Sequence, residues 1–299
     1  EDIAGNAGIG GVSSDPFDWG VPNLSFSTFS AVRDTNPTDR IDTRFTASYS
    51  STKPLRTHTL RYGVDFAQDR SSALTNSNAR GSFVFTGLYT GGGTVVRGTA
   101  NDFADFLLGL PQQASIAYGP GRVQLRGRSL SGYIQDDWRK SGGLTFNLGL
   151  RYDFVWPYTE ANGQMVNLDA ASGFSGVAPV LSGGTGLYSG VFPAALVNTD
   201  GNNIAPRVAV AWRAARATIV RAGYGVTYNS GSYASIARQL VGQPPFATTN
   251  TSVGGAADPL SFDDPFILAS PTTTTNNYGI DRDYVLGLIQ TWNVDVSQD

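Results

Sequence analysis

The sequence predicts an all-β protein, an antiparallel β-barrel that crosses a membrane. Three features lead to this prediction: alternating apolar and polar residues, alternating short and long connections, and a composition poor in charge. Every second residue from Leu144 to Phe154 is apolar, and the residues between them are polar or glycine. Because a strand turns alternate side chains to opposite faces, this segment has one apolar and one polar face. Its length of about 11 residues suits one tilted strand crossing a bilayer.

The composition favours the same fold class. Only 15% of the residues are charged, whereas aromatic residues reach 11% and glycine occurs 36 times. Soluble domains usually carry about a quarter charged residues, whereas each strand of an outer-membrane barrel turns half of its side chains to lipid. No window approaches the ~20 apolar residues of a transmembrane helix. The net charge of −3 argues against nucleic acid as a partner, and the lack of cysteine excludes disulfides and thiolate metal sites.

The alternation predicts eight strands joined by two kinds of connection. The strands are predicted at residues 23–33, 40–52, 56–69, 123–139, 144–155, 204–213, 218–229 and 284–298. Three connections are short turns, at 52–55, 140–143 and 214–217. Three others are long loops rich in Gly, Ser, Thr, Asn and Pro, at 70–122, 156–203 and 230–283. Outer-membrane barrels combine short periplasmic turns with long extracellular loops, and compact soluble domains seldom carry structureless loops of this length.

The ends of the chain lead us to expect a piece of a longer protein. The sequence starts at Glu1 and Asp2, no signal peptide is visible, and it stops with the last predicted strand. We therefore expect residues 1–299 to form a single, partial barrel domain.

Polar residues of the alternate parity define the predicted inner face. A charge on the lipid face costs about 2–4 kcal/mol for Arg or Lys at mid-bilayer, so strand arginines are best placed inside. The predicted lumen-facing residues are Arg61, Asp65, Asn147, Arg151, Asp153, Arg221, Thr227 and Asn229. Two roles remain open for the arginines: structural contacts, either ion pairs with Asp65 or Asp153 or contacts to a plug, and direct contact with a substrate.

Aromatic residues are predicted to anchor the barrel at the level of the lipid headgroups. The predicted girdle comprises Trp138, Tyr152, Trp156, Trp212 and Trp292. The alternative is that these are core residues of a soluble sandwich. One strand breaks the pattern, because the adjacent Asp136 and Asp137 must point to opposite faces. Their place near a short turn suggests the membrane interface, and a bulge is the alternative.

The sequence shows no convincing catalytic constellation, so no enzyme, cofactor or metal is predicted. The only histidine, His58, falls on the apolar face beside a short turn and is interpreted as packed or interfacial. A transition-metal site would need unusual ligands, and no Gly-x-Ser-x-Gly elbow is present. An acidic loop segment is interpreted as solvated, with Ca²⁺ binding as the alternative; it contains Asp258, Asp263 and Asp264. Loop aromatics either capture a ligand or pack the loops: Tyr89, Tyr118, Phe174, Tyr188, Phe246 and Tyr278.

Several phrases together resemble the barrel of Oar-like TonB-dependent outer-membrane receptors. In order along residues 15–229 they read DPFDWGVP, HTLRYGVD, GSFVFTG, FADFLLGLP, YIQDDW, LTFNLGLRYD, NIAPR and RAGYG. The resemblance implies a barrel of 22 strands, of which this chain would supply about 8. It also implies a preceding plug and a carboxypeptidase-regulatory-like domain, both absent here.

Members of this family move large substrates across the outer membrane of Gram-negative-type cells, using energy relayed by TonB. The resemblance thus implies three partners: outer-membrane lipid, the TonB complex acting through the missing plug region, and an unknown extracellular substrate. Two other readings stay open, a passive porin-like or structural barrel and a soluble secreted β-sandwich that binds a ligand. The sandwich predicts that the apolar row of residues 144–154 packs on a second sheet.

Overall fold

The computed structural model describes residues 1–95, 98–266 and 277–298. The chain divides into two compact units, which are described separately. The first comprises residues 1–41, 73–123 and 241–277, and the second comprises residues 42–72, 124–240 and 278–299. Strands account for 50% of the structure and helices for 9%, which confirms the all-β prediction. None of the described helices has the length and apolar character needed to cross a membrane.

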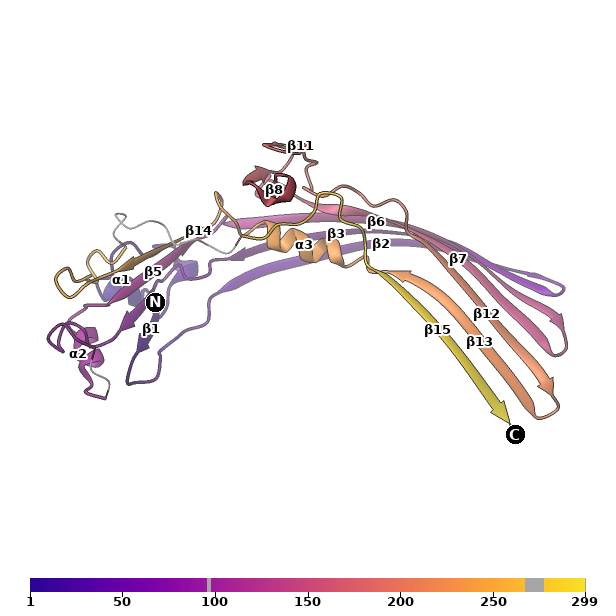
Figure 1. Ribbon diagram of the computed structural model, residues 1–299, viewed down its shortest axis with the longest axis horizontal. Coiled ribbons are helices and arrows are strands. Elements are labelled where there is room, and N and C mark those ends of the chain that lie inside the picture. Colours follow the sequence, from indigo (N-terminus) through magenta and orange to yellow (C-terminus); the bar gives the residue numbers. More distant parts are fainter. Residues whose placement is uncertain (96–97, 267–276, 299) are drawn as a thin grey trace. The chain divides into compact units, whose positions relative to one another are not determined.

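A seven-stranded sheet dominates the second unit (Figure 1). Its order is β15-β13-β12-β7-β6-β3-β2. The bounds are β2 Thr38–Leu55, β3 His58–Thr75, β6 Arg122–Ser141, β7 Leu144–Glu160, β12 Ile204–Ala215, β13 Thr218–Tyr228 and β15 Leu288–Gln298. The pairings among β6, β7, β12, β13 and β15 are antiparallel. In the described residues the sheet stays open, with β2 and β15 at its two ends.

The prediction of strands is confirmed for seven of the eight segments and wrong for residues 23–33. That segment contains only the short strand β1 (Asn23–Phe26), which pairs in parallel with β4 (Ser82–Phe85) outside the seven-stranded sheet. The ring of Phe26 stacks on Phe85, with centroids 5.5 Å apart. Packing against a distant aromatic residue thus decides the position of β1. The alternation of residues within 23–33 gives no information about this contact.

Two-residue turns join three strand pairs of the sheet, at positions 56–57, 142–143 and 216–217. The last two agree with the predicted turns, whereas the first lies a few residues later than expected. In the β6–β7 turn both residues are glycine, Gly142 and Gly143. The three turns therefore lie at one end of the strands, opposite the long connections.

The long connections of the first unit are folded, which corrects the expectation of structureless loops. They form a four-stranded sheet of order β1-β4-β5-β14, completed by β5 (Gln113–Tyr118) and β14 (Thr248–Val253). Helix α2 (Asn101–Leu107) places Phe106 edge-on to Phe85, at 5.4 Å between ring centroids. The short elements α1 (Ile3–Asn6) and η1 (Pro16–Asp18) complete the unit. Its core comprises Ala4, Ile9, Leu24, Phe83, Phe85, Ala114, Ile116, Leu260 and Phe266.

The connections in the second unit are also ordered. Strands β8 (Val166–Ala170) and β9 (Val177–Leu181) form a hairpin that encloses η2 (Ser172–Phe174). A smaller hairpin joins β10 (Thr185–Gly186) and β11 (Gly190–Val191). Helix α3 (Ser232–Leu240) lies against β7. It buries Tyr233, Ile236, Ala237 and Leu240, the spacing of one helical face.

Buried carboxylates organise these connections. In the first unit, Asp105 accepts hydrogen bonds from Thr90, through the backbone N–H at 2.9 Å and the hydroxyl at 2.8 Å. In the second, Glu160 accepts backbone N–H groups of Gln124 at 2.9 Å, Asn162 at 2.7 Å and Gln164 at 3.0 Å. A loop backbone out of contact with water needs partners for its N–H groups. Carboxylates accept these hydrogen bonds where no neighbouring strand does.

Candidate functional site: the polar face of the seven-stranded sheet

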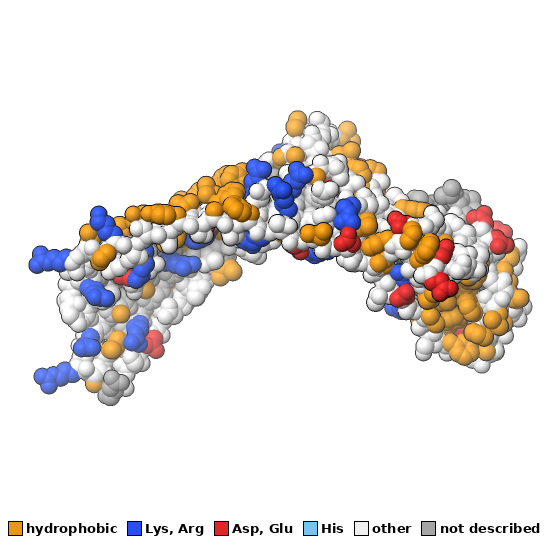
Figure 2. Space-filling view, turned by 180° about the vertical axis from the view of Figure 1, so that it is seen from behind, with side chains coloured by type: hydrophobic (Ala, Val, Ile, Leu, Met, Phe, Trp, Pro, Cys, Tyr) orange, Lys and Arg blue, Asp and Glu red, His pale blue; other side chains and the backbone are white. Residues whose placement is uncertain are grey.

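Strand register assigns the residues of the sheet to two faces. Leu148 of β7 stands opposite Asp136 of β6 and Val208 of β12, and Val208 stands opposite Tyr224 of β13. Residues in directly opposed positions share a face. Figure 2 shows hydrophobic side chains gathered along one side of this sheet and Lys and Arg side chains along the other.

The apolar face is uncovered in the described part of the chain. Leu148 is 40% exposed and Trp292 is 75% exposed. The alternative of a soluble sandwich, in which residues 144–154 pack on a second sheet, does not agree with the described residues. Large exposed apolar surfaces mark contacts with membranes or partners.

Seven of the eight predicted lumen-facing residues fall together on the opposite, polar face. Register places Asn147, Arg151, Asp153, Arg221 and Thr227 on it. Arg61 and Asp65 of β3 reach the same face through ion pairs with Asp137 and Arg151. Asn229 follows the last residue of β13.

Three arginines of the polar face are paired with aspartates. Arg61 lies 2.6 Å from Asp137, and Arg221 lies 3.1 Å from Asp295. Arg151 bridges Asp153 at 2.8 Å and Asp65 at 3.6 Å. Partly exposed pairs of this kind contribute about 0–1 kcal/mol each. Arg61, Arg151 and Arg221 thereby connect β3 to β6 and β7, and β13 to β15.

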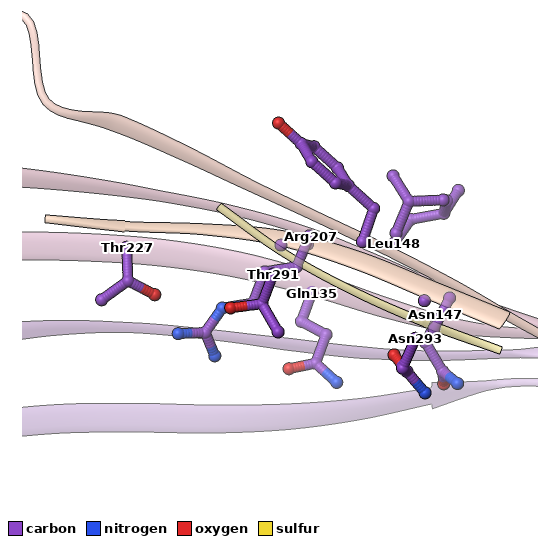
Figure 3. Close-up of a pocket in the computed structure, with 13 residues that line it drawn as sticks. Gln135, Asn147, Leu148, Arg207, Thr227, Thr291 and Asn293 are labelled. Carbon is purple, nitrogen blue, oxygen red and sulfur yellow. The ribbon is translucent and has the colours of Figure 1, made fainter. Parts of the chain in front are cut away.

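A hollow of about 400 Å³ lies on the polar face around Arg207 (Figure 3). Arg207 stands between Gly149 of β7 and Gly225 of β13, directly opposite both. A Cβ at Gly149 would lie 3.6 Å from the Arg207 Cβ, and one at Gly225 would lie 3.5 Å from its Cγ. Because neither glycine has a side chain, both leave open space on the polar face beside the Arg207 side chain. The polar lining comprises Gln135, Asn147, Thr227, Thr291 and Asn293.

Unlike Arg61, Arg151 and Arg221 on the same face, Arg207 makes no ion pair within the described residues. No carboxylate lines the hollow. Figure 3 shows the labelled polar side chains on one side of the strands, whereas Leu148 points to the other. A guanidinium ringed by amides and hydroxyls suits an anionic or polyhydroxylated group.

Sequence reasoning missed Arg207 and Gln135. The signal was present, because Ala205, Arg207, Ala209 and Ala211 alternate with Pro206, Val208, Val210 and Trp212. The glycines on both neighbouring strands, which make room for Arg207, become visible only with the register.

The five predicted girdle residues all lie on the apolar face. Trp138 pairs with Phe146 and Trp212 with Leu144, both next to short turns. Tyr152 pairs with Ile204, and Trp156 pairs with Arg128 toward the long connections. Trp292 stands opposite Tyr224, in the middle of β13 and β15.

Asp136 and Asp137 point to opposite faces, as predicted, because they pair with Leu148 and Asn147 respectively. No bulge separates them, since the register shift of β6 lies between Arg139 and Ser141. Asp136 is therefore on the apolar face. Its Oδ2 lies 2.7 Å from the Nδ1 of His58, whose ring stacks on Trp138 at 5.5 Å.

A second cavity, of about 600 Å³, lies among the connections of the second unit. Its lining includes Asp169, Phe174, Phe192 and Arg282. Burial raises the pKa of Asp169. Hydrogen bonds from the Ser189 hydroxyl and the backbone N–H groups of Tyr188 and Ser189, together with nearby Arg282, outweigh this effect and lower the pKa. The carboxylate is thus a permanent negative charge at neutral pH.

The loop residues singled out from the sequence are dispersed. Phe174 lines this cavity and is 82% exposed, whereas Tyr89 packs beside Gly254 in the first unit. Across the described residues, no group of three or more His, Cys, Asp or Glu is placed to hold a metal ion. Asp258, Asp263 and Asp264 are among the described residues, and they form no such group.

Comparison with known families adds the deciding observation. A family model described as an outer membrane beta barrel domain matches residues 1–299. The chain belongs to this family. The membership implies an outer-membrane location for the domain. No curated protein matches the chain.

Proposed function

We propose that this barrel domain is part of a TonB-dependent outer-membrane receptor that binds a large substrate outside the cell and moves it across the membrane. The apolar face of the sheet contacts outer-membrane lipid, and the polar face lines the interior. The role is transport and not enzymatic catalysis. The observation that carries the proposal is that the long connections are folded.

Folded loops suit a receptor because a binding surface must hold its shape before the substrate arrives. The connections of the first unit have a core of their own, built around Phe83 and Phe85. Those of the second unit line an open cavity of about 600 Å³ beside Asp169 and Arg282. Buried carboxylates hold the loop backbones in place.

The hollow around Arg207 supports movement along the polar face. It offers a cation, amides and hydroxyls to a passing anionic or hydroxylated group. The phrases that resemble Oar-like receptors support the choice of a receptor within the family. In this proposal TonB acts through a plug region that lies outside residues 1–299.

Conductance of the full-length natural protein in planar lipid bilayers tests the proposal. A receptor filled by a plug should show no steady current, and it should bind the purified periplasmic domain of TonB. Removing the predicted plug region should open a steady conductance, which serves as the control for correct insertion. Steady current through the natural protein, without TonB binding, would instead identify a passive porin-like barrel.

A further inference from the structure

Basic residues gather at the short-turn end of the seven-stranded sheet. Two lie at each turn, and none of the segments 53–57, 139–143 and 213–217 contains an acidic residue. All of them are exposed. We call this set the basic rim; it comprises Lys53, Arg56, Arg139, Lys140, Arg213 and Arg216. Figure 2 shows Lys and Arg side chains projecting from this end of the sheet.

The basic rim lacks the counter-charges that balance three arginines farther along the polar face. Arg61, Arg151 and Arg221 each have an aspartate partner on the polar face. Within the described residues, no rim residue makes an ion pair. The nearest acids along β6 are already engaged, Asp136 by His58 and Asp137 by Arg61. The positive charge of the rim is thus available to an external anion.

The apolar face ends where the basic rim begins. On β6, Trp138 lies on the apolar face and Lys140 follows two residues later. The Nζ of Lys140 lies 5.7 Å from the centre of the Trp138 ring. On β12, Trp212 directly precedes Arg213. Aromatic and basic side chains in this order occur where hydrocarbon gives way to lipid headgroups.

We propose that the basic rim binds the phosphates of anionic phospholipids in the leaflet at the short-turn side. The lipid, rather than an acidic protein, is favoured because the rim is continuous with the apolar face. One lipid molecule can place its chains on that face beside Trp138 and its phosphate at Lys140. Cations near an anionic surface are attracted individually and add together. The proposal does not depend on whether the protein is a receptor or a passive pore.

Lipid enrichment around the full-length protein tests this proposal. The protein is reconstituted in phosphatidylcholine bilayers that contain one tenth phosphatidylglycerol, and the lipids that remain bound after detergent extraction are counted by mass spectrometry. We expect phosphatidylglycerol to be enriched several-fold over its bulk fraction. The enrichment should fade as salt shortens the screening length below about 8 Å.

A rim variant and a matched control locate the effect. The rim variant carries Arg139→Gln, Lys140→Gln, Arg213→Gln and Arg216→Gln and should lose the enrichment. The control carries Arg33→Gln, Arg70→Gln, Arg126→Gln and Arg238→Gln, removes the same charge from exposed positions away from the short turns, and should keep it. Heat-modified gel migration verifies that both variants are folded. Equal enrichment in the rim variant and the natural protein, or none in the natural protein, would overturn the proposal.

Discussion

Asp136 is a carboxylate on the face of the sheet that otherwise carries apolar side chains. Its Oδ2 contacts His58, while its Oδ1 has no partner among the described residues. The imidazole is held between this carboxylate and the Trp138 ring. Each of these two polar groups loses contact with water on the apolar face. The contact between them is the main interaction that offsets this desolvation.

Removing one member of this pair should cost more than removing both. His58→Leu leaves Asp136 without its partner, so we expect the free energy of unfolding to fall by about 2 kcal/mol. The double variant His58→Leu/Asp136→Leu should recover most of that loss, because an apolar pair suits an apolar face. Urea unfolding of the full-length protein in phosphatidylcholine vesicles measures both. Losses that simply add would show that the two side chains act independently.

Asp169 links loop stability to pH. Its pKa is lowered on folding, so its stabilising effect is complete above the ordinary carboxyl pKa of about 4 and is lost as the pH falls through the lower folded value. At neutral pH, Asp169→Asn should speed amide hydrogen exchange at Tyr188 and Ser189 on the order of tenfold. Asp281→Asn, in the same cavity, is the control and should leave both amides protected. Unchanged exchange in Asp169→Asn would contradict this role.

Strands β3, β6 and β7 are tied together by one tyrosine. Tyr158 of β7 lies over Gly127 of β6, and its hydroxyl donates a hydrogen bond of 2.8 Å to Asp69 of β3. A Cβ at Gly127 would overlap the tyrosine ring. The glycine therefore serves close packing between neighbouring strands, a recognised role of glycine within sheets.

Gly127→Ala should displace Tyr158 and break its hydrogen bond to Asp69. Overpacking of this kind costs about 1–3 kcal/mol. Gly132→Ala in the same strand is the matched control, because its nearest neighbour would be the Gly63 carbonyl oxygen at 3.9 Å. Adding Tyr158→Ala to Gly127→Ala should remove the clash, and no further loss beyond that of Tyr158→Ala alone is expected. Urea midpoints in lipid vesicles compare the four variants with the natural protein.

At the scale of the whole molecule, the two faces of the sheet should meet different surroundings. Leu148 and Asn147 are adjacent in β7 and point to opposite faces. The chain contains no cysteine, so single cysteines report without background in the full-length protein, provided that its remaining sequence is also free of accessible cysteine.

Labelling of outer-membrane vesicles checks this arrangement. Leu148→Cys should react with a lipid-confined probe, and Asn147→Cys with a polar maleimide that does not enter hydrocarbon. Each variant is the control for the other, since the two positions share one strand and one depth. Labelling of Leu148→Cys by the polar probe alone would contradict lipid contact at the apolar face.

The sequence by itself determined the strands of the sheet, the two faces of several of them and the positions of most turns. The alternation of residues 144–154 is local and has a period of two, so it is readable without a partner strand. It also showed that Asp136 and Asp137 point to opposite faces. The family match agrees with the fold class that this pattern predicts.

Only the tertiary structure decided the rest. The folded loops depend on contacts such as Phe26 with Phe85, between short segments far apart in the chain. The partner of Asp136 is His58, 78 residues away, and the hollow at Arg207 needs glycines contributed by two other strands. Periodicity records which face a side chain takes. It does not record which distant side chain shares that face, because that follows from strand order and register.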